Sequence, residues 1–198
     1  MSHVRSLLLE IANELLLLGV DVSRNLNSGA SPVQIQQACE GLPFQLPPEV
    51  CDLFMWRNGI KEGDFEGEFR LLPRFCFRTV QESAKTSRQF SKTFGDSDEA
   101  WRSSWFYLFN DLAGDFLAYD TDPSLLTGAR IIAVRHGLGT HSAFCSLEQM
   151  LSGVLECYRT GAYFLDEDGF LIDDERLADL IFKKTNNGLS PYSDILDL

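Results

Sequence analysis

The chain has 198 residues, of which 44% are apolar and 12% aromatic, and a formal net charge of −12 at pH 7. A chain of this length and composition can bury a core of its own, which excludes a disordered polypeptide. The excess of acids argues against binding to nucleic acid, because that binding gains its free energy from Lys and Arg on phosphates. A basic protein partner is the more natural expectation.

The cysteines and the apolar runs indicate in which cellular compartment the protein is expected. The five cysteines are odd in number and lie far apart in apolar segments, as small buried side chains in a reducing compartment do. We therefore expect a cytoplasmic protein. The longest apolar run, Leu15 to Val20, is far shorter than the roughly 20 residues of a membrane span, so no membrane association is expected. Glu10 and Glu14 interrupt what would otherwise resemble a secretory signal.

Helical patterns open the chain. Residues 3 to 19 predict an amphipathic helix with an apolar stripe of Val4, Leu7, Leu8, Ile11, Leu15 and Leu18. Residues 25 to 30 are interpreted as a loop. Ser31, followed by Pro32 and Gln34, predicts a capped helix that ends near residue 40. A third helix is expected over residues 49 to 57, with Asn58 and Gly59 as its stop.

Strand patterns follow. Residues 67 to 77 look extended, with Pro73 limiting the strand to an edge or an end, and residues 79 to 92 are compatible with a helix. Residues 105 to 111 and 116 to 119 flank a turn that contains Gly114, which predicts a β-hairpin. Residues 129 to 135 predict a third strand.

The last part of the chain returns to helices. Ser146 and Gln149 predict a capping box for a helix that Gly161 ends. A tight turn is expected between residues 163 to 165 and 170 to 172, and a final helix over 173 to 184. Consecutive strands after helices predict an α+β fold with a mixed, mostly antiparallel sheet packed with helices. No linker or repeat divides residues 1 to 198, so we expect one domain, with an N-terminal helix in 1 to 25 and a C-terminal helix and tail in 173 to 198.

No motif for a metal or cofactor is complete. The run Asp166-Glu167-Asp168-Gly169 resembles a calcium loop, but in that register the first ligand position is Phe164 and the ninth is Ile172. His136 and His141 match no zinc spacing. Gly137-Leu138-Gly139 lacks the further glycine and lysine of a phosphate-binding loop. We expect no metal, no cofactor and no catalytic residues.

An enzyme nevertheless remains the alternative hypothesis. Cys145 and His141 would serve a cysteine-dependent hydrolase, but no Asn or Asp stands near the histidine in sequence to orient it. The apolar residues before Cys145 favour a buried thiol.

Candidate partner-binding residues lie in the predicted hairpin. Strict alternation places Trp105, Tyr107 and Phe109 on one face of the sheet, and an exposed aromatic beside acids would anchor a partner. Residues 96 to 122 and 164 to 179 each carry seven acids against one arginine. The hypothesis names five binding residues: Trp105, Tyr107, Asp111, Asp115 and Asp120.

A family resemblance emerges from the order of these motifs. The helix opening Ser31-Pro32, the run Leu46-Pro47-Pro48-Glu49, and Trp56-Arg57-Asn58-Gly59 resemble the start of the SUKH superfamily. A Trp-led strand from Trp105, the turn Gly114-Asp115 and the helix start Ser146-Leu147-Glu148 follow in the same order. The resemblance covers residues 31 to 165. The helix at 3 to 19 lies outside it.

The resemblance implies a fold and a function. The superfamily is α+β and includes bacterial immunity proteins against toxins and fungal regulators of cell-wall assembly, neither known for catalysis. It therefore implies a non-enzymatic protein-binding module, either a toxin-neutralising immunity protein or a regulatory scaffold. Fold alone cannot name the partner.

Overall fold

A computed structural model describes residues 2 to 61, 70 to 95, 101 to 111, 113 to 125 and 130 to 192. The predicted start of the extended segment at 67 to 69, the acids at 96, 98 and 99, and the tail at 193 to 198 lie outside these residues. None of the described helices is both long and apolar enough to span a bilayer.

Helices and one small sheet form the first third of the chain. Helix α1 (His3–Leu17) and the short α2 (Val22–Asn25) lead into β1 (Leu26–Ser28), and α3 (Pro32–Ala38) and α4 (Pro48–Trp56) lead into β2 (Arg57–Ile60). Strands β1 and β2 pair antiparallel. The loop predicted at 25 to 30 is therefore wrong, and Asn58 and Gly59 end a helix by entering a strand.

The central sheet has five strands in chain order: β3 (Cys76–Phe77), β4 (Trp105–Asn110), β5 (Phe116–Asp120), β6 (Ile131–Arg135) and β7 (Gly139–Phe144). Every neighbouring pair in it is antiparallel. Helix α5 (Val80–Thr93) crosses from β3 to β4, with a capping box at Thr79 and Glu82. The predicted α+β fold with an antiparallel sheet is confirmed.

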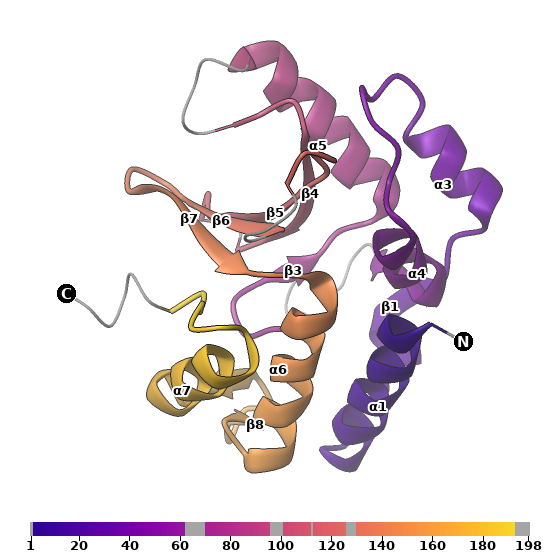
Figure 1. Cartoon of the computed structure of the whole chain (residues 1–198). Coiled ribbons are helices and arrows are strands. Elements are labelled where there is room, and N and C mark those ends of the chain that lie inside the picture. The colour runs from indigo at the N-terminus through magenta and orange to yellow at the C-terminus, as the bar shows by residue number, and fades with distance from the viewer. Residues whose placement is uncertain (1, 62–69, 96–100, 112, 126–129, 193–198) are drawn as a thin grey trace.

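Two helices and a hairpin complete the chain. Helix α6 (Leu147–Thr160) begins at Ser146, whose hydroxyl accepts from Gln149 N–H, and ends at Gly161 in the left-handed conformation. The hairpin of β8 (Tyr163–Leu165) and β9 (Leu171–Asp173) matches the predicted turn, and α7 (Glu175–Thr185) follows. Helices α1, α6 and α7 lie together below the sheet, with α5 above it and α3 and α4 to one side (Figure 1).

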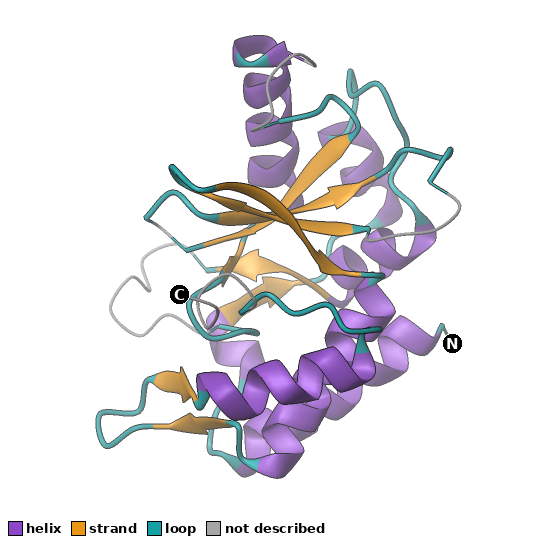
Figure 2. Cartoon of the chain, turned by 60° about the vertical axis from the view of Figure 1, so that its left-hand side comes forward, coloured by secondary structure: helices purple, strands orange, loops and turns teal. Residues whose placement is uncertain are grey.

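The sheet separates two apolar clusters. The larger cluster joins one face of the sheet to α1, α4, α6 and α7, and Figure 2 shows this layer of helices beneath the strands. The smaller cluster, on the other face, contains Trp101, Trp105 and Phe116, and Phe90 of α5 packs against it.

A β-bulge decides which aromatics belong to which cluster. Tyr107 pairs with Ala118 and Phe109 with Leu117, so β4 carries one extra residue between them. Trp105 and Tyr107 therefore face the smaller cluster, whereas Phe109 joins Phe106 in the larger one. The predicted alternation is wrong at Phe109, because a bulge reverses the side-chain pattern beyond it.

Strand β7 is a further element that the sequence pattern does not predict. No strand is expected over residues 136 to 144, yet His141 pairs with Ala133 of β6 and Thr140 with Val134. At the sheet edge the first part of β7 is exposed, so its side chains need not be apolar.

Candidate functional site

The residues predicted to bind a partner instead hold the β4–β5 hairpin together. Trp105 and Asp120 are both 3% exposed, and Trp105 Nε1 donates to Asp120 Oδ2 over 3.0 Å. Tyr107 is half-buried, and this burial raises its pKa to about 12. Burial leaves Trp105 and Asp120 without a surface on which to meet a partner, so this part of the hypothesis is corrected.

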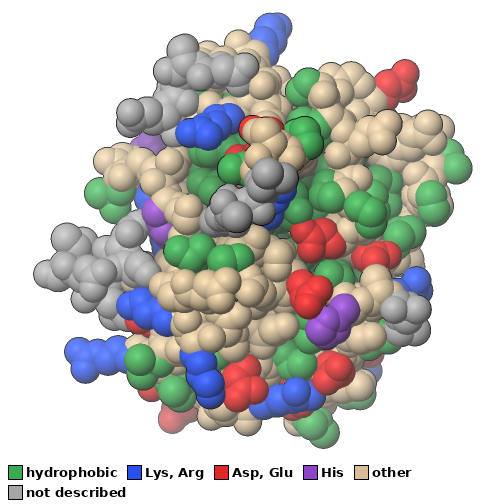
Figure 3. Space-filling view, in the orientation of Figure 1, with side chains coloured by type: hydrophobic (Ala, Val, Ile, Leu, Met, Phe, Trp, Pro, Cys, Tyr) green, Lys and Arg blue, Asp and Glu red, His purple; other side chains and the backbone are tan. Residues whose placement is uncertain are grey.

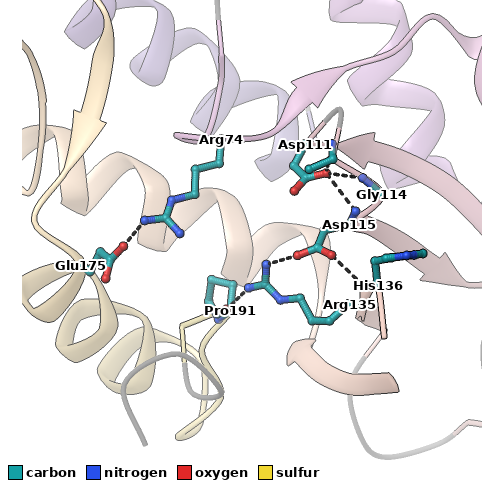
Figure 4. Close-up of polar contacts among 9 residues, drawn as sticks. Arg74, Asp111, Gly114, Asp115, Arg135, His136, Glu175 and Pro191 are labelled. Atoms are coloured by element: carbon teal, nitrogen blue, oxygen red, sulfur yellow. Dashed lines mark hydrogen bonds and ion pairs between the residues drawn. The ribbon is translucent and has the colours of Figure 1, made fainter. Parts of the chain in front are cut away.

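The two remaining acids organise the turn of the hairpin (Figure 4). Asp111 Oδ1 accepts the backbone N–H groups of residues 113, 114 and 115 over 2.8 to 3.0 Å. Asp115 accepts from Arg135 Nη1 over 2.8 Å and from His136 N–H over 2.7 Å. Both carboxylates therefore already have hydrogen-bond partners within the fold, and Asp115 also pairs with the cation Arg135.

Two acids of α1 also pair within the fold. Glu10 and Glu14 both contact the guanidinium of Arg159 on α6, over 2.7 and 3.3 Å. These ion pairs connect the two helices.

Cys145, the nucleophile of the hydrolase hypothesis, has structural contacts with Asn186 and Asn187. Its backbone N–H donates to Asn186 Oδ1 over 2.8 Å, and its Sγ contacts Asn186 O and Asn187 Nδ2 over 3.8 Å each. The Asn186 side chain also donates to Ala143 O, so it binds backbone and ties the end of α7 to β7. Both Nδ2 hydrogens of Asn186 and one lone pair of its Oδ1 are used in contacts with backbone groups.

The acidic turn between β8 and β9 uses its first carboxylate internally. Asp166 Oδ1 accepts from the N–H groups of Asp168 and Phe170 over 3.0 and 2.8 Å. Within the described ranges, no three His, Cys, Asp or Glu side chains form a group that could hold a metal ion.

We expect calcium to leave the thermal stability unchanged. A ligand that binds the native state raises stability in proportion to its occupancy, and among the described residues no three His, Cys, Asp or Glu side chains form a group that could hold the ion. Differential scanning fluorimetry with 5 mM calcium and with 5 mM magnesium gives the comparison. A calcium-specific rise of several degrees would overturn this interpretation of residues 164 to 175.

A groove lies between α3 and α4. Its volume is about 830 Å³, within the roughly 300 to 1,000 Å³ typical of binding pockets. Its apolar lining comes from both helices and from the segment that joins them: Val33, Ile35, Leu42, Phe44, Leu46 and Met55.

Local interactions position the two helices that form the walls of this groove. Ser31 Oγ accepts from Gln34 N–H over 3.2 Å and Gln34 Oε1 from Ser31 N–H over 2.8 Å, which starts α3 where predicted. Helix α4 buries Val50, Leu53 and Phe54 on its other side. The segment before α3 lies so close to α4 that a Cβ on Gly29 would stand 1.8 Å from Met55 O.

Two half-buried thiols lie in the groove. Cys39 ends α3 and Cys51 lies on α4. Burial, with Cys51 nearby, raises the pKa of Cys39 to about 11, and burial with Asp52 nearby raises the pKa of Cys51. Both groups are protonated at neutral pH, so neither is a ready nucleophile, because the thiolate is the reactive form.

Sequence reasoning missed this site. It treated the cysteines as fully buried, which holds for Cys76 and Cys157 but not for Cys39 and Cys51. The available signal was the segment 42 to 46, in which the apolar residues Leu42, Phe44 and Leu46 alternate with Pro43 and Gln45 outside any predicted helix or strand.

The chain matches no known protein-family model, and a search of curated proteins finds no significantly similar sequence. The resemblance to the SUKH superfamily therefore stays a prediction.

Proposed function

We propose that this protein is a non-enzymatic protein-binding module whose α3–α4 groove receives an apolar, basic segment of a partner protein. The observation that carries the proposal is the apolar groove with Val33 on its wall, since Val33 keeps 60% of its surface exposed. Exposed apolar side chains around a hollow are typical of interaction sites.

Charge supports a basic partner. Glu40 lines the groove and Asp52 lies close enough to Cys51 to raise its pKa. In Figure 3 hydrophobic side chains gather over α3 and α4, with acidic side chains below them. The net charge of −12 adds a long-range attraction for a basic protein.

The biological setting follows from the resemblance in the sequence. An immunity protein would cover the basic surface of a toxin, and a regulatory scaffold would hold a partner in a complex. Both roles require binding and no chemistry, which agrees with the protonated thiols of the groove. In either setting the protein acts by occupying its partner's surface.

The test uses two labelled peptides, one of Leu and Lys in a helical amphipathic pattern and one of Leu and Glu in the same pattern. We expect the Leu/Lys peptide to bind and Val33→Asp to weaken it by about tenfold or more, since a charge in a desolvated apolar contact costs over about 1.4 kcal/mol. Fluorescence anisotropy measures both affinities, and stopped-flow rates should fall as salt rises.

The matched control is Leu138→Asp. Leu138 is 76% exposed in the turn before β7, so this variant adds the same charge away from the groove and should bind as the wild type does. Equal losses in both variants, or equal binding of the two peptides, would contradict the proposal.

A further inference from the structure

A strip of exposed apolar side chains follows the β8–β9 hairpin and α7. Within the described part of the chain, five large apolar side chains between residues 164 and 180 are exposed: Phe164, Phe170, Ile172, Leu177 and Leu180. Leu180 keeps 65% of its surface accessible and Phe170 keeps 52%. Exposed apolar patches flanked by polar side chains mark interaction sites on folded proteins.

The hairpin and α7 share one buried contact, which fixes their outward faces. The hydroxyls of Tyr163 on β8 and Tyr192 lie 3.4 Å apart, and the Phe182 ring of α7 stacks on the Tyr192 ring with 6.1 Å between centroids. Because side chains alternate across a strand, Phe164 points away from this buried tyrosine. Ile172 is the cross-strand partner of Phe164, so it lies on the same outward face.

Helical geometry gives α7 an outward stripe as well. At 3.6 residues per turn, Leu177, Leu180 and Lys184 lie within about 60° of one another around the helix axis, opposite Phe182. Lys184 is exposed and belongs to the last turn of the helix. The stripe is therefore apolar along the helix and basic at its end.

The other end of the strip is acidic. Glu167 and Asp168 are exposed in the turn of the hairpin. Figure 2 shows this turn pointing away from α7, which extends from the opposite end of the hairpin. Acidic, apolar and basic side chains thus follow one another from the hairpin turn to the end of α7.

We propose that this strip is the interface of a symmetric homodimer, so that its occupant is a second copy of the chain. A twofold axis through the apolar middle lays two strips antiparallel. Glu167 and Asp168 of one copy then meet Lys184 of the other, and the same contact forms twice. A twofold interface requires a self-complementary surface of this kind. Any other partner would need the same order of charges, which a second copy has by construction.

The net charge sets the conditions under which the dimer forms. Each copy carries −12, and this long-range repulsion opposes association. At 0.15 M salt, repulsion between charges more than about 8 Å apart is largely screened, whereas pairs in contact keep more of their attraction. In Figure 1 the strip lies on the side of the molecule away from α3, so the dimer leaves the α3–α4 groove open. The inference therefore does not depend on the proposed function.

Sedimentation equilibrium at 0.15 M salt over micromolar concentrations tests the dimer. We expect the wild type to dimerise and Leu180→Asp to weaken dimerisation by about 100-fold, since each dimer buries the new charge twice at about tenfold each. Val33→Asp is the matched control, because Val33 is exposed to a similar degree, 60%, but lies on α3. It should lose the Leu/Lys peptide and keep the dimer, while Leu180→Asp should do the reverse, so the two proposals fail separately.

A charge exchange tests the antiparallel arrangement itself. The double variant Glu167→Lys, Asp168→Lys places like charges opposite Lys184, and Lys184→Glu places like charges opposite the turn. Each variant alone should dimerise about tenfold more weakly than the wild type. An equal mixture of the two should recover dimerisation, because both contacts then join opposite charges. A monomeric wild type, equal losses in Leu180→Asp and Val33→Asp, or no recovery in the mixture would overturn the inference.

Discussion

Gly59→Ala is expected to destabilise the protein by about 4 kcal/mol or more. Gly59 has φ +74°, and a Cβ there would stand 2.4 Å from Thr79 N and 2.6 Å from Arg78 C. These are backbone atoms at the start of α5, so no side chain can rotate away to make room. The neighbouring Asn58 accepts from Val80 N–H over 2.8 Å, which holds β2 against α5.

The matched control separates the collision from the backbone strain. Gly169 has a similar φ of +85°, but no atom lies within 4 Å of its would-be Cβ. Gly169→Ala should therefore cost only about 1 to 2 kcal/mol, the strain of the left-handed conformation. Urea unfolding followed by circular dichroism measures both, and equal losses would show that the close approach of β2 to α5 is not tight.

Asp115→Ala is expected to cost about 3 kcal/mol, because it leaves a mostly buried guanidinium without its carboxylate. The Arg135 side chain is only 10% exposed, and its Nε already has no hydrogen-bond partner among the described residues. Its Nη2 would remain bonded to Pro191 O over 2.8 Å. Asp168→Ala, on the exposed β8–β9 turn, removes one acid without a buried partner and should be nearly neutral.

The pH dependence of this loss has a definite sign. Burial opposes the charge of Asp115, but the Arg135 guanidinium and the His136 N–H outweigh it and lower its pKa. A lowered pKa in the folded state adds stability above the ordinary pKa of an aspartate, and this stability disappears as pH falls through the lowered value. The difference between wild type and Asp115→Ala should therefore shrink in acid. A difference that stays constant from pH 7 to pH 3 would contradict the ion pair.

Local signals predicted several elements correctly. The Ser31 start of α3, the Ser146 start of α6 and its end at Gly161 are present, and α5 covers the region predicted to be compatible with a helix. The β4–β5 hairpin follows the pattern of aromatic and β-branched residues. Each of these features depends on residues close together in the chain, such as a capping hydroxyl or a glycine that can adopt a positive φ. The spacing of residues in the sequence therefore predicts them.

Local patterns in the sequence predict the α+β class, most helix limits and the strands of the hairpin. The bulge that turns Phe109 away from Tyr107, the strand β7 at the sheet edge and the shared burial of Trp105 and Asp120 depend instead on tertiary packing. The groove that Cys39 of α3 lines together with Cys51 and Met55 of α4 depends on it too. Such contacts depend on how elements pack, and no local periodicity records which faces will meet.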